Sequence, residues 1–201
     1  VAFKPWCAAR QTMAATQALI EIIRSGVAAD SITQVTAFVL PPHRRMIDHG
    51  VTLGDRASFL TSLPYRLAIA ALARHAAWDV GQARASVPDE VRAFMDRVAI
   101  VPDETLLSNF PSQWPARVEV MTSSRRYERT VTDVPGDPAR PFDAGDVREK
   151  FHRFIAPVIG TEASAQMLEH AFGLLNGQVE AAGLLHQIDE LGGIHQRDET
   201  K

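Results

Sequence analysis

Cysteine and long apolar runs are both scarce in this sequence of 201 residues. The single cysteine, Cys7, can neither close a disulfide within the chain nor hold a zinc ion or an iron–sulfur cluster by itself. No run of about 18 apolar residues occurs, so the sequence predicts no membrane-spanning helix. We therefore expect a protein of a reducing compartment, the cytoplasm.

Neither sign of charge is in large excess. The 21 Lys and Arg residues face 24 Asp and Glu residues, and the net charge is −3. Such a balance gives no general attraction for a polyanion, which argues against nucleic acid and anionic membranes as partners. The basic pairs Arg44-Arg45 and Arg125-Arg126 have no aromatic residues between them, and we interpret them as solvated loop charges.

Three common enzyme motifs are missing. The sequence has no G-x-G-x-x-G after a strand, no phosphate loop of the G-x-x-x-x-G-K type and no G-x-S-x-G elbow. No two histidines lie four residues apart on one predicted helix near a carboxylate, so we predict no metal site and no cofactor. The one histidine that we single out is His49, which follows Asp48 in a predicted loop beside the mouth of a site.

The remaining composition is that of a globular protein, with 46% hydrophobic and 22% charged residues. A chain of this length hides roughly 70% of its extended surface, enough for one domain or at most two. Residues 1–4 resemble neither a basic leader nor the apolar core of a signal peptide. We interpret the chain as a segment of a longer polypeptide.

Hydrophobic periodicity divides the chain into helices and strands. Ser62 and Asp143 are predicted helix caps, and residues 41–57 are predicted to form a loop. Helices are predicted at 7–25, 63–76, from 88, from 143, at 167–175 and at 179–188, the last ended by Gly192-Gly193; strands are predicted at 32–39, 98–101, 117–121 and 127–134. This order lacks regular strand–helix alternation, so we predict an α+β fold: a small mixed or antiparallel sheet packed against helices, with a C-terminal helical segment.

Three stretches carry a resemblance to a known family. They read Lys4-Pro5-Trp6-Cys7 running into Arg10, then Ala57-Ser58-Phe59 with Ser62-Leu63-Pro64-Tyr65, then Pro135-Gly136-Asp137-Pro138 followed by Pro141 and Lys150-Phe151. In this order and at these spacings they resemble the C-terminal part of the MmgE/PrpD family over nearly the whole chain.

The resemblance implies an activity and an organisation. Known members include 2-methylcitrate dehydratase, cis-aconitate decarboxylase and iminodisuccinate epimerase, which act on small di- or tricarboxylates without an iron–sulfur cluster. Residues 1–201 are then the C-terminal α+β domain of a two-domain chain, whose N-terminal helical domain carries several catalytic residues. We expect a homodimer, no cofactor and no metal.

The resemblance also implies site residues. Lys4 matches a pocket lysine that would pair with a substrate carboxylate and stabilise the enolate-like state. Tyr65 would donate a hydrogen bond or act as an acid, and Arg10 would bind a carboxylate. The plainer alternatives are an exposed lysine, a core tyrosine and a surface arginine. We expect Cys7 to be a small buried apolar residue.

One departure from the family affects the chemistry. Many members carry a histidine shortly after the lysine motif, where this chain reads Ala8-Ala9-Arg10-Gln11-Thr12-Met13. Dehydration, decarboxylation and epimerisation therefore stay open.

The first hypothesis is a metal-independent lyase of the dehydratase type, inactive as an isolated segment. The alternatives are a non-catalytic dimerisation or regulatory domain and a small-molecule binding protein. Lys4 and Tyr65 in one concave pocket would favour the first hypothesis, and a flat apolar surface would favour the second.

Overall fold

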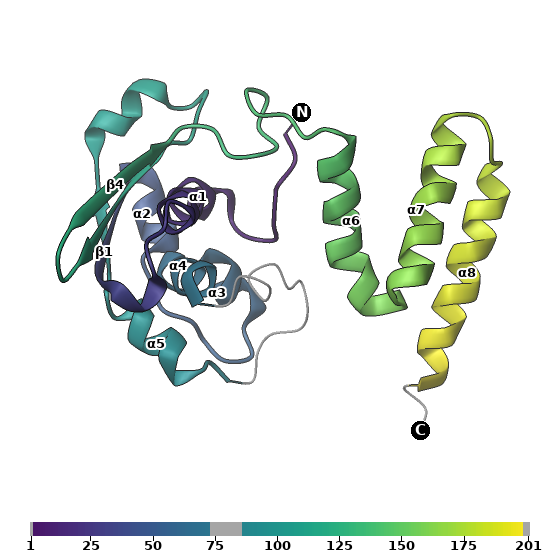
Figure 1. Cartoon of the computed structure of the whole chain (residues 1–201), viewed down its shortest axis with the longest axis horizontal. Coiled ribbons are helices and arrows are strands. Elements are labelled where there is room, and N and C mark those ends of the chain that lie inside the picture. The colour runs from purple at the N-terminus through teal and green to yellow at the C-terminus, as the bar shows by residue number, and fades with distance from the viewer. Residues whose placement is uncertain (1, 73–85, 199–201) are drawn as a thin grey trace. The chain divides into compact units, whose positions relative to one another are not determined.

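The structure, a computed structural model, describes residues 2–72 and 86–198. The chain divides into two compact units, Val1–Phe142 (unit 1) and Asp143–Lys201 (unit 2). Figure 1 shows the elements of each unit in chain order.

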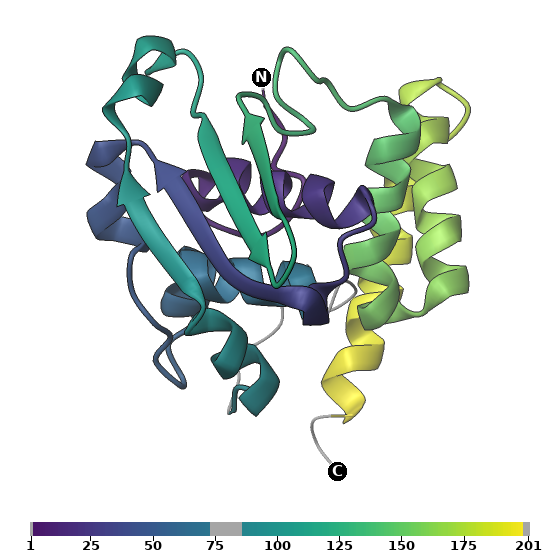
Figure 2. The same cartoon turned by 60° about the vertical axis from the view of Figure 1, so that its left-hand side comes forward.

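Unit 1 contains a four-stranded mixed sheet, as Figure 2 shows. Its strands are β1 (Ile32–Val39), β2 (Val98–Pro102), β3 (Ala116–Thr122) and β4 (Arg126–Val131), in the spatial order β2-β1-β3-β4. β1 runs parallel to β2 and antiparallel to β3, and β3 pairs with β4 in an antiparallel hairpin. The α+β fold with a small mixed sheet is therefore confirmed.

One face of this sheet is covered by helices. α1 (Arg10–Arg24) packs against β1, β3 and β4, and α4 (Leu63–Leu72) packs against α1, β2 and α5 (Asp89–Met95). Side chains alternate along the strands, so that Val35, Ala37 and Val39 of β1 are buried. Completely or almost completely buried apolar side chains join these elements into one core: Met13, Leu19, Val35, Leu67, Phe94 and Val118. Each such side chain contributes roughly 1.5–3 kcal/mol through removal from water.

The predicted loop at 41–57 is wrong at both ends. α2 (Pro41–Ile47) begins directly after β1, and α3 (Arg56–Thr61) begins at the end of the predicted loop. Pro41 and Pro42 occupy the first helical positions, where proline loses no backbone hydrogen bond, so the same prolines that stop the strand start a helix. Two 3₁₀ helices, Ala29–Ser31 and Glu104–Asn109, were also not predicted.

The predicted caps are both present. The Ser62 hydroxyl accepts a hydrogen bond from the Tyr65 backbone N–H at 3.3 Å. Asp143 and Asp146 form a reciprocal capping box, in which each side chain accepts from the backbone N–H of the other. α4 is described to Leu72, and positions 73–76 of its predicted range lie outside the described residues.

Unit 2 consists of the helices α6 (Ala144–Ile159), α7 (Thr161–Leu175) and α8 (Ala181–Asp198). α6 packs against α7, and α7 packs against α8. The prediction that Gly192-Gly193 ends the last helix is wrong, because α8 continues to Asp198. Glycine lowers helix propensity but keeps its backbone N–H, so it does not by itself stop a helix. The C-terminal helical segment is confirmed.

Candidate functional site

The candidate site is built on the residues that precede and begin α1. We call Phe3–Arg10 the Lys4 segment. The Phe3 backbone N–H donates to the Gly136 carbonyl at 2.8 Å, and the Ala9 N–H donates to the Leu60 carbonyl at 2.8 Å. The Lys4 Nζ donates to the Ala8 carbonyl at 3.2 Å, which folds the lysine back over its own segment.

A surface hollow of about 270 Å³ lies between the Lys4 segment and α3. Lys4 is exposed, and among the described residues that line this hollow it is the one with a charge. The others are small or apolar: Cys7, Ala8, Ala9, Ala57, Leu60 and Thr61. Water screens an ammonium group less when the group lies beside a mostly apolar wall. Such a group therefore attracts an anion more strongly than one on an open surface.

Tyr65 is not among the residues that line this hollow. It lies in α4, is only 4% exposed, and its ring packs edge-to-face on Phe59 with 5.0 Å between centroids. Phe59 belongs to α3, whose next residues Leu60 and Thr61 line the hollow. Tyr65 therefore packs on the same helix that forms one wall of the hollow.

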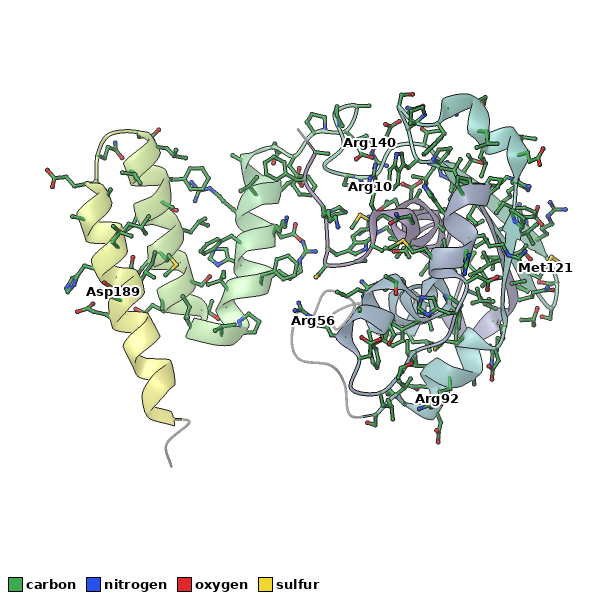
Figure 3. The ribbon with its side chains drawn as sticks, turned by 180° about the vertical axis from the view of Figure 1, so that it is seen from behind. Arg10, Arg56, Arg92, Met121, Arg140 and Asp189 are labelled. Atoms are coloured by element: carbon green, nitrogen blue, oxygen red, sulfur yellow. The ribbon has the colours of Figure 1, made fainter. Side chains whose placement is uncertain are left out.

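Arg10 is bound to a carboxylate of its own chain. Its Nη2 donates to both carboxylate oxygens of Asp137 at 2.7 Å. Asp137 is 3% exposed and also accepts from the Val134 N–H at 2.8 Å. The Arg10 guanidinium lies 5.9 Å from the centroid of the Trp114 ring. Figure 3 shows Arg10 at the start of α1; Arg140, also labelled there, donates its backbone N–H to the Asp137 carbonyl.

Gly136 is required by its surroundings. It adopts φ +93°, and an added Cβ would lie 2.2 Å from the Phe3 carbonyl oxygen. No other residue fits this close approach without moving the backbone. The contacts of Phe3, Ala9 and Arg10 thus bring the three stretches of the family resemblance together in space, which spacing along the sequence could not show.

Two other residues singled out from the sequence lie elsewhere or differ from expectation. The His49 ring has its Nδ1 2.6 Å from the Gly50 carbonyl, and His49 does not line the hollow. Cys7 is half-exposed rather than buried, because it lies in the Lys4 segment before α1 begins.

His43 was not singled out from the sequence. Its ring centroid lies 4.6 Å from that of Trp114 and 5.6 Å from that of Phe110. Burial against these rings lowers the pKa of His43, because it disfavours the charged imidazole. The neutral form therefore predominates at neutral pH.

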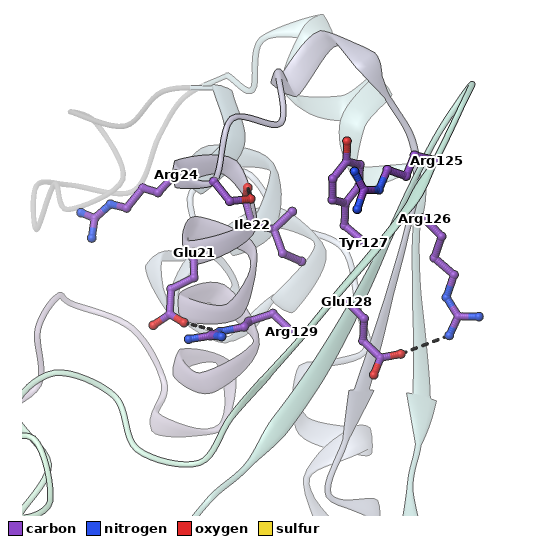
Figure 4. A pocket seen from close by; sticks show the side chains of 9 residues that line it. Glu21, Ile22, Arg24, Arg125, Arg126, Tyr127, Glu128 and Arg129 are labelled. Carbon is purple, nitrogen blue, oxygen red and sulfur yellow. Dashed lines mark hydrogen bonds and ion pairs between the residues drawn. The ribbon is translucent and has the colours of Figure 1, made fainter.

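A second hollow, of about 600 Å³, lies between the C-terminal part of α1 and β4 (Figure 4). Its charged groups are largely paired: Arg129 Nε donates to Glu21 at 2.6 Å, and Arg126 Nη2 donates to Glu128 at 3.1 Å. Burial opposes ionisation of Glu21, but hydrogen bonds from Gln17 and Arg129 outweigh it and lower the Glu21 pKa. Arg24 extends away from β4, so this hollow offers fewer uncommitted donors than its arginine count suggests.

The described residues show neither a cluster of metal ligands nor a membrane-spanning helix. Within 2–72 and 86–198, no group of three or more His, Cys, Asp and Glu residues could hold a metal ion. No helix in the same ranges is long and apolar enough to cross a membrane.

Comparison with known proteins gives one family match. The model of the MmgE/PrpD C-terminal domain matches residues 6–174. This range includes Arg10, Tyr65 and Asp137, and it begins two residues after Lys4. No curated protein matches the chain.

Proposed function

Because the chain belongs to the MmgE/PrpD family, we propose that it is the C-terminal domain of a metal-independent lyase that dehydrates small di- or tricarboxylates such as 2-methylcitrate. Dehydration of such a substrate removes a proton next to a carboxylate and expels a hydroxyl group. Negative charge builds up on that carboxylate, so a cation must already be in place beside it.

The observation that supports this proposal most directly is Lys4 at the small, mostly apolar hollow. A lysine ammonium has three N–H donors, and Lys4 directs one of them to the Ala8 carbonyl. The other donors are available to a carboxylate. In this proposal Lys4 binds the substrate and stabilises the enolate-like state.

The groups that move protons come from elsewhere in the proposed enzyme. The described residues that line the hollow include no histidine, aspartate or glutamate. We assign proton transfer to an N-terminal helical domain of the same polypeptide that covers Lys4. Tyr65 would take part only if its hydroxyl reaches the substrate, and Arg10 only through the nitrogen atoms that it does not direct to Asp137.

The test is the turnover of 2-methylcitrate, citrate and cis-aconitate by the full-length protein and its variants. We expect Lys4→Ala to lower kcat/KM by about a hundredfold or more, the usual cost of removing one group that stabilises developing charge. Lys4→Arg keeps the cation and should retain more activity than Lys4→Ala.

Arg92→Ala is the matched control, because Arg92 is an exposed cation on α5 and does not line the hollow (Figure 3). It should leave turnover unchanged. An unchanged rate in Lys4→Ala would remove Lys4 from the site, and robust turnover by the 201-residue chain alone would refute the assignment of proton transfer to another domain.

A second candidate is a non-catalytic dimerisation or regulatory domain. It is favoured by large apolar side chains exposed on unit 2: Val147, Val158, Leu175, Leu185 and Ile188. Sedimentation of the full-length protein would show a homodimer that Leu185→Ser weakens. A homodimer that turns over none of the three carboxylates would favour this candidate over the lyase.

A further inference from the structure

Two adjacent residues hold both ends of the Lys4 segment. At its first residue, the Phe3 N–H donates to the Gly136 carbonyl at 2.8 Å. At its last residue, Arg10 Nη2 donates to the two carboxylate oxygens of Asp137. The segment is therefore closed into a loop by Gly136-Asp137, and Lys4 lies inside that loop.

The turn that contains Asp137 is itself well ordered by hydrogen bonds. The Asp137 N–H donates to the Val134 carbonyl, the Arg140 N–H donates to the Asp137 carbonyl, and the Gly136 N–H donates to the Arg140 carbonyl. The Asp137 carboxylate is buried and accepts three hydrogen bonds, two from Arg10 and one from the Val134 N–H. Removing the Arg10 charge would leave the buried Asp137 carboxylate without compensation, whereas Asp137→Asn leaves a partly exposed guanidinium and removes the ionic part of the contact.

Arg10, the partner of Asp137, is the first residue of α1. The core of unit 1 fixes α1 through side chains such as Met13 and Leu19. The pair Arg10–Asp137 therefore joins a rigid helix to the turn, and Gly136 joins the turn to Phe3. Lys4 is next to Phe3, so one connection from the core to the lysine runs through Asp137; a second runs through Trp6 and Ala8, which are themselves buried in the core.

We propose that Asp137 is a positioning residue, which through Arg10 and the Gly136 turn holds the Lys4 ammonium at the hollow. This rests on the proposed function, since Lys4 is taken to bind the substrate carboxylate. A displacement of about 1 Å of a charge-stabilising group lowers turnover severely. Loss of the Arg10–Asp137 pair should therefore lower turnover by letting Lys4 move. Arg10 then acts on the substrate indirectly, through the segment that it closes.

The test is a double-mutant cycle in the full-length protein with Asp137→Asn and Lys4→Ala. Asp137→Asn should lower kcat/KM by about tenfold or more, through the same parameter, kcat or KM, that Lys4→Ala changes. In the Lys4→Ala background it should have no further effect, because its action runs through the lysine. An effect of equal size in both backgrounds would overturn the proposal, since a general loss of structure does not depend on Lys4.

Asp103→Asn is the matched control. Asp103 accepts from Arg117 Nη2 at 3.2 Å and from the Thr105 N–H at 3.0 Å, so it also joins an arginine and a backbone N–H. It lies directly after β2, away from the Lys4 segment in the chain. It should leave kcat/KM unchanged, and a loss equal to that of Asp137→Asn would also overturn the proposal.

A second readout needs no turnover. Cys7 lies within the closed segment and is half-exposed, so alkylation of its thiol, followed by mass spectrometry of the peptide that contains it, becomes faster when the segment opens and exposes the thiol further. Asp137→Asn should raise the alkylation rate measurably, and Asp103→Asn should not change it.

The two readouts separate two kinds of failure. If Lys4→Ala leaves turnover unchanged while Asp137→Asn still accelerates alkylation of Cys7, the assignment of Lys4 is wrong but the closure of the segment stands. An unchanged alkylation rate in Asp137→Asn would overturn the closure itself. If Asp137→Asn does not fold, Arg10→Lys takes its place, because it keeps the charge but loses the guanidinium. It should lower kcat/KM and accelerate alkylation of Cys7, both to a smaller degree.

Discussion

The two units of this chain differ most in how much apolar surface they bury. Unit 1 places side chains from α1, α4, α5 and the sheet in one core, in which Met13, Leu67 and Val118 have no exposed surface. Between 143 and 190, where side chains of unit 2 are described, the only buried residues are Ser164, Leu168 and Gly173. Leu175 and Leu185 are 80% and 61% exposed.

This difference gives unit 1 a rigid core and leaves unit 2 with exposed apolar surface. Helices of 15 to 18 residues gain most of their stability in proteins from packing, and α6 has no fully buried residue to supply it. Unit 1 can hold the Lys4 segment in a fixed geometry because its elements are anchored in a core. The apolar side chains of unit 2 are suited to contact with another surface.

The largest expected effect tests the core of unit 1. Phe94→Ala removes a ring that is 1% exposed, and it should lower the free energy of unfolding by about 3–5 kcal/mol through lost burial and the cavity left behind. All three tryptophans lie in Val1–Phe142, so their fluorescence during urea denaturation reports unit 1 alone. A loss below about 1 kcal/mol would contradict the core described for unit 1.

A smaller effect is expected from the same kind of change in unit 2. Leu168→Ala removes the one large apolar side chain that is buried among residues 143–190, and it should cost about 2–3 kcal/mol. Hydrogen exchange should accelerate in α6, α7 and α8 and stay unchanged in α1 and α4. Equal acceleration in both units would show that they unfold together, and the contrast between them would fail.

Acid should weaken unit 1 through His43. Because burial lowers the pKa of His43 in the folded state, the unfolded chain binds a proton at a higher pH, near 6.5. The stability supplied by the neutral ring is complete above pH 6.5 and decreases as the pH falls through the folded pKa. In His43→Phe this part of the pH dependence should disappear from urea denaturation curves. An unchanged pH profile would show that His43 does not contribute.

The smallest effect is expected at Leu175. Leu175→Gln changes a side chain that is 80% exposed, and it should alter the free energy of unfolding by no more than about 0.5 kcal/mol. Denaturation of the variant at low protein concentration measures this. A loss of 2 kcal/mol or more would contradict this, and if the stability of the parent chain also rises with protein concentration, Leu175 lies in an interface between copies.

The sequence predicted those elements whose hydrophobic pattern reports burial directly. β1 was predictable because Val35, Ala37 and Val39 alternate with polar or half-exposed residues. Pro41 and Pro42 carry no such information, since they can end a strand or begin a helix with equal ease. Gly192-Gly193 was misleading because glycine weakens a helix without removing its hydrogen bonds.

The site was predictable only in part. The sequence and the family resemblance pointed to Lys4, Tyr65 and Arg10, and their roles stay predictions. The partner of Arg10 was not predictable, because Asp137 lies 127 positions away and no spacing rule joins them. The wall of the hollow was also missed, because Leu60 and Thr61 belong to a helix that the periodicity did not reveal.

The bond between residues 10 and 137 also sets an order of events. Contacts between distant positions form late, because the intervening chain must lose conformational entropy before the contact can stabilise the fold. During synthesis Phe3 and Arg10 stay without their partners Gly136 and Asp137 until the ribosome has passed the turn at 135–140. A product terminated before that turn would retain the sequences of α1, β1 and α4 but could not close the Lys4 segment.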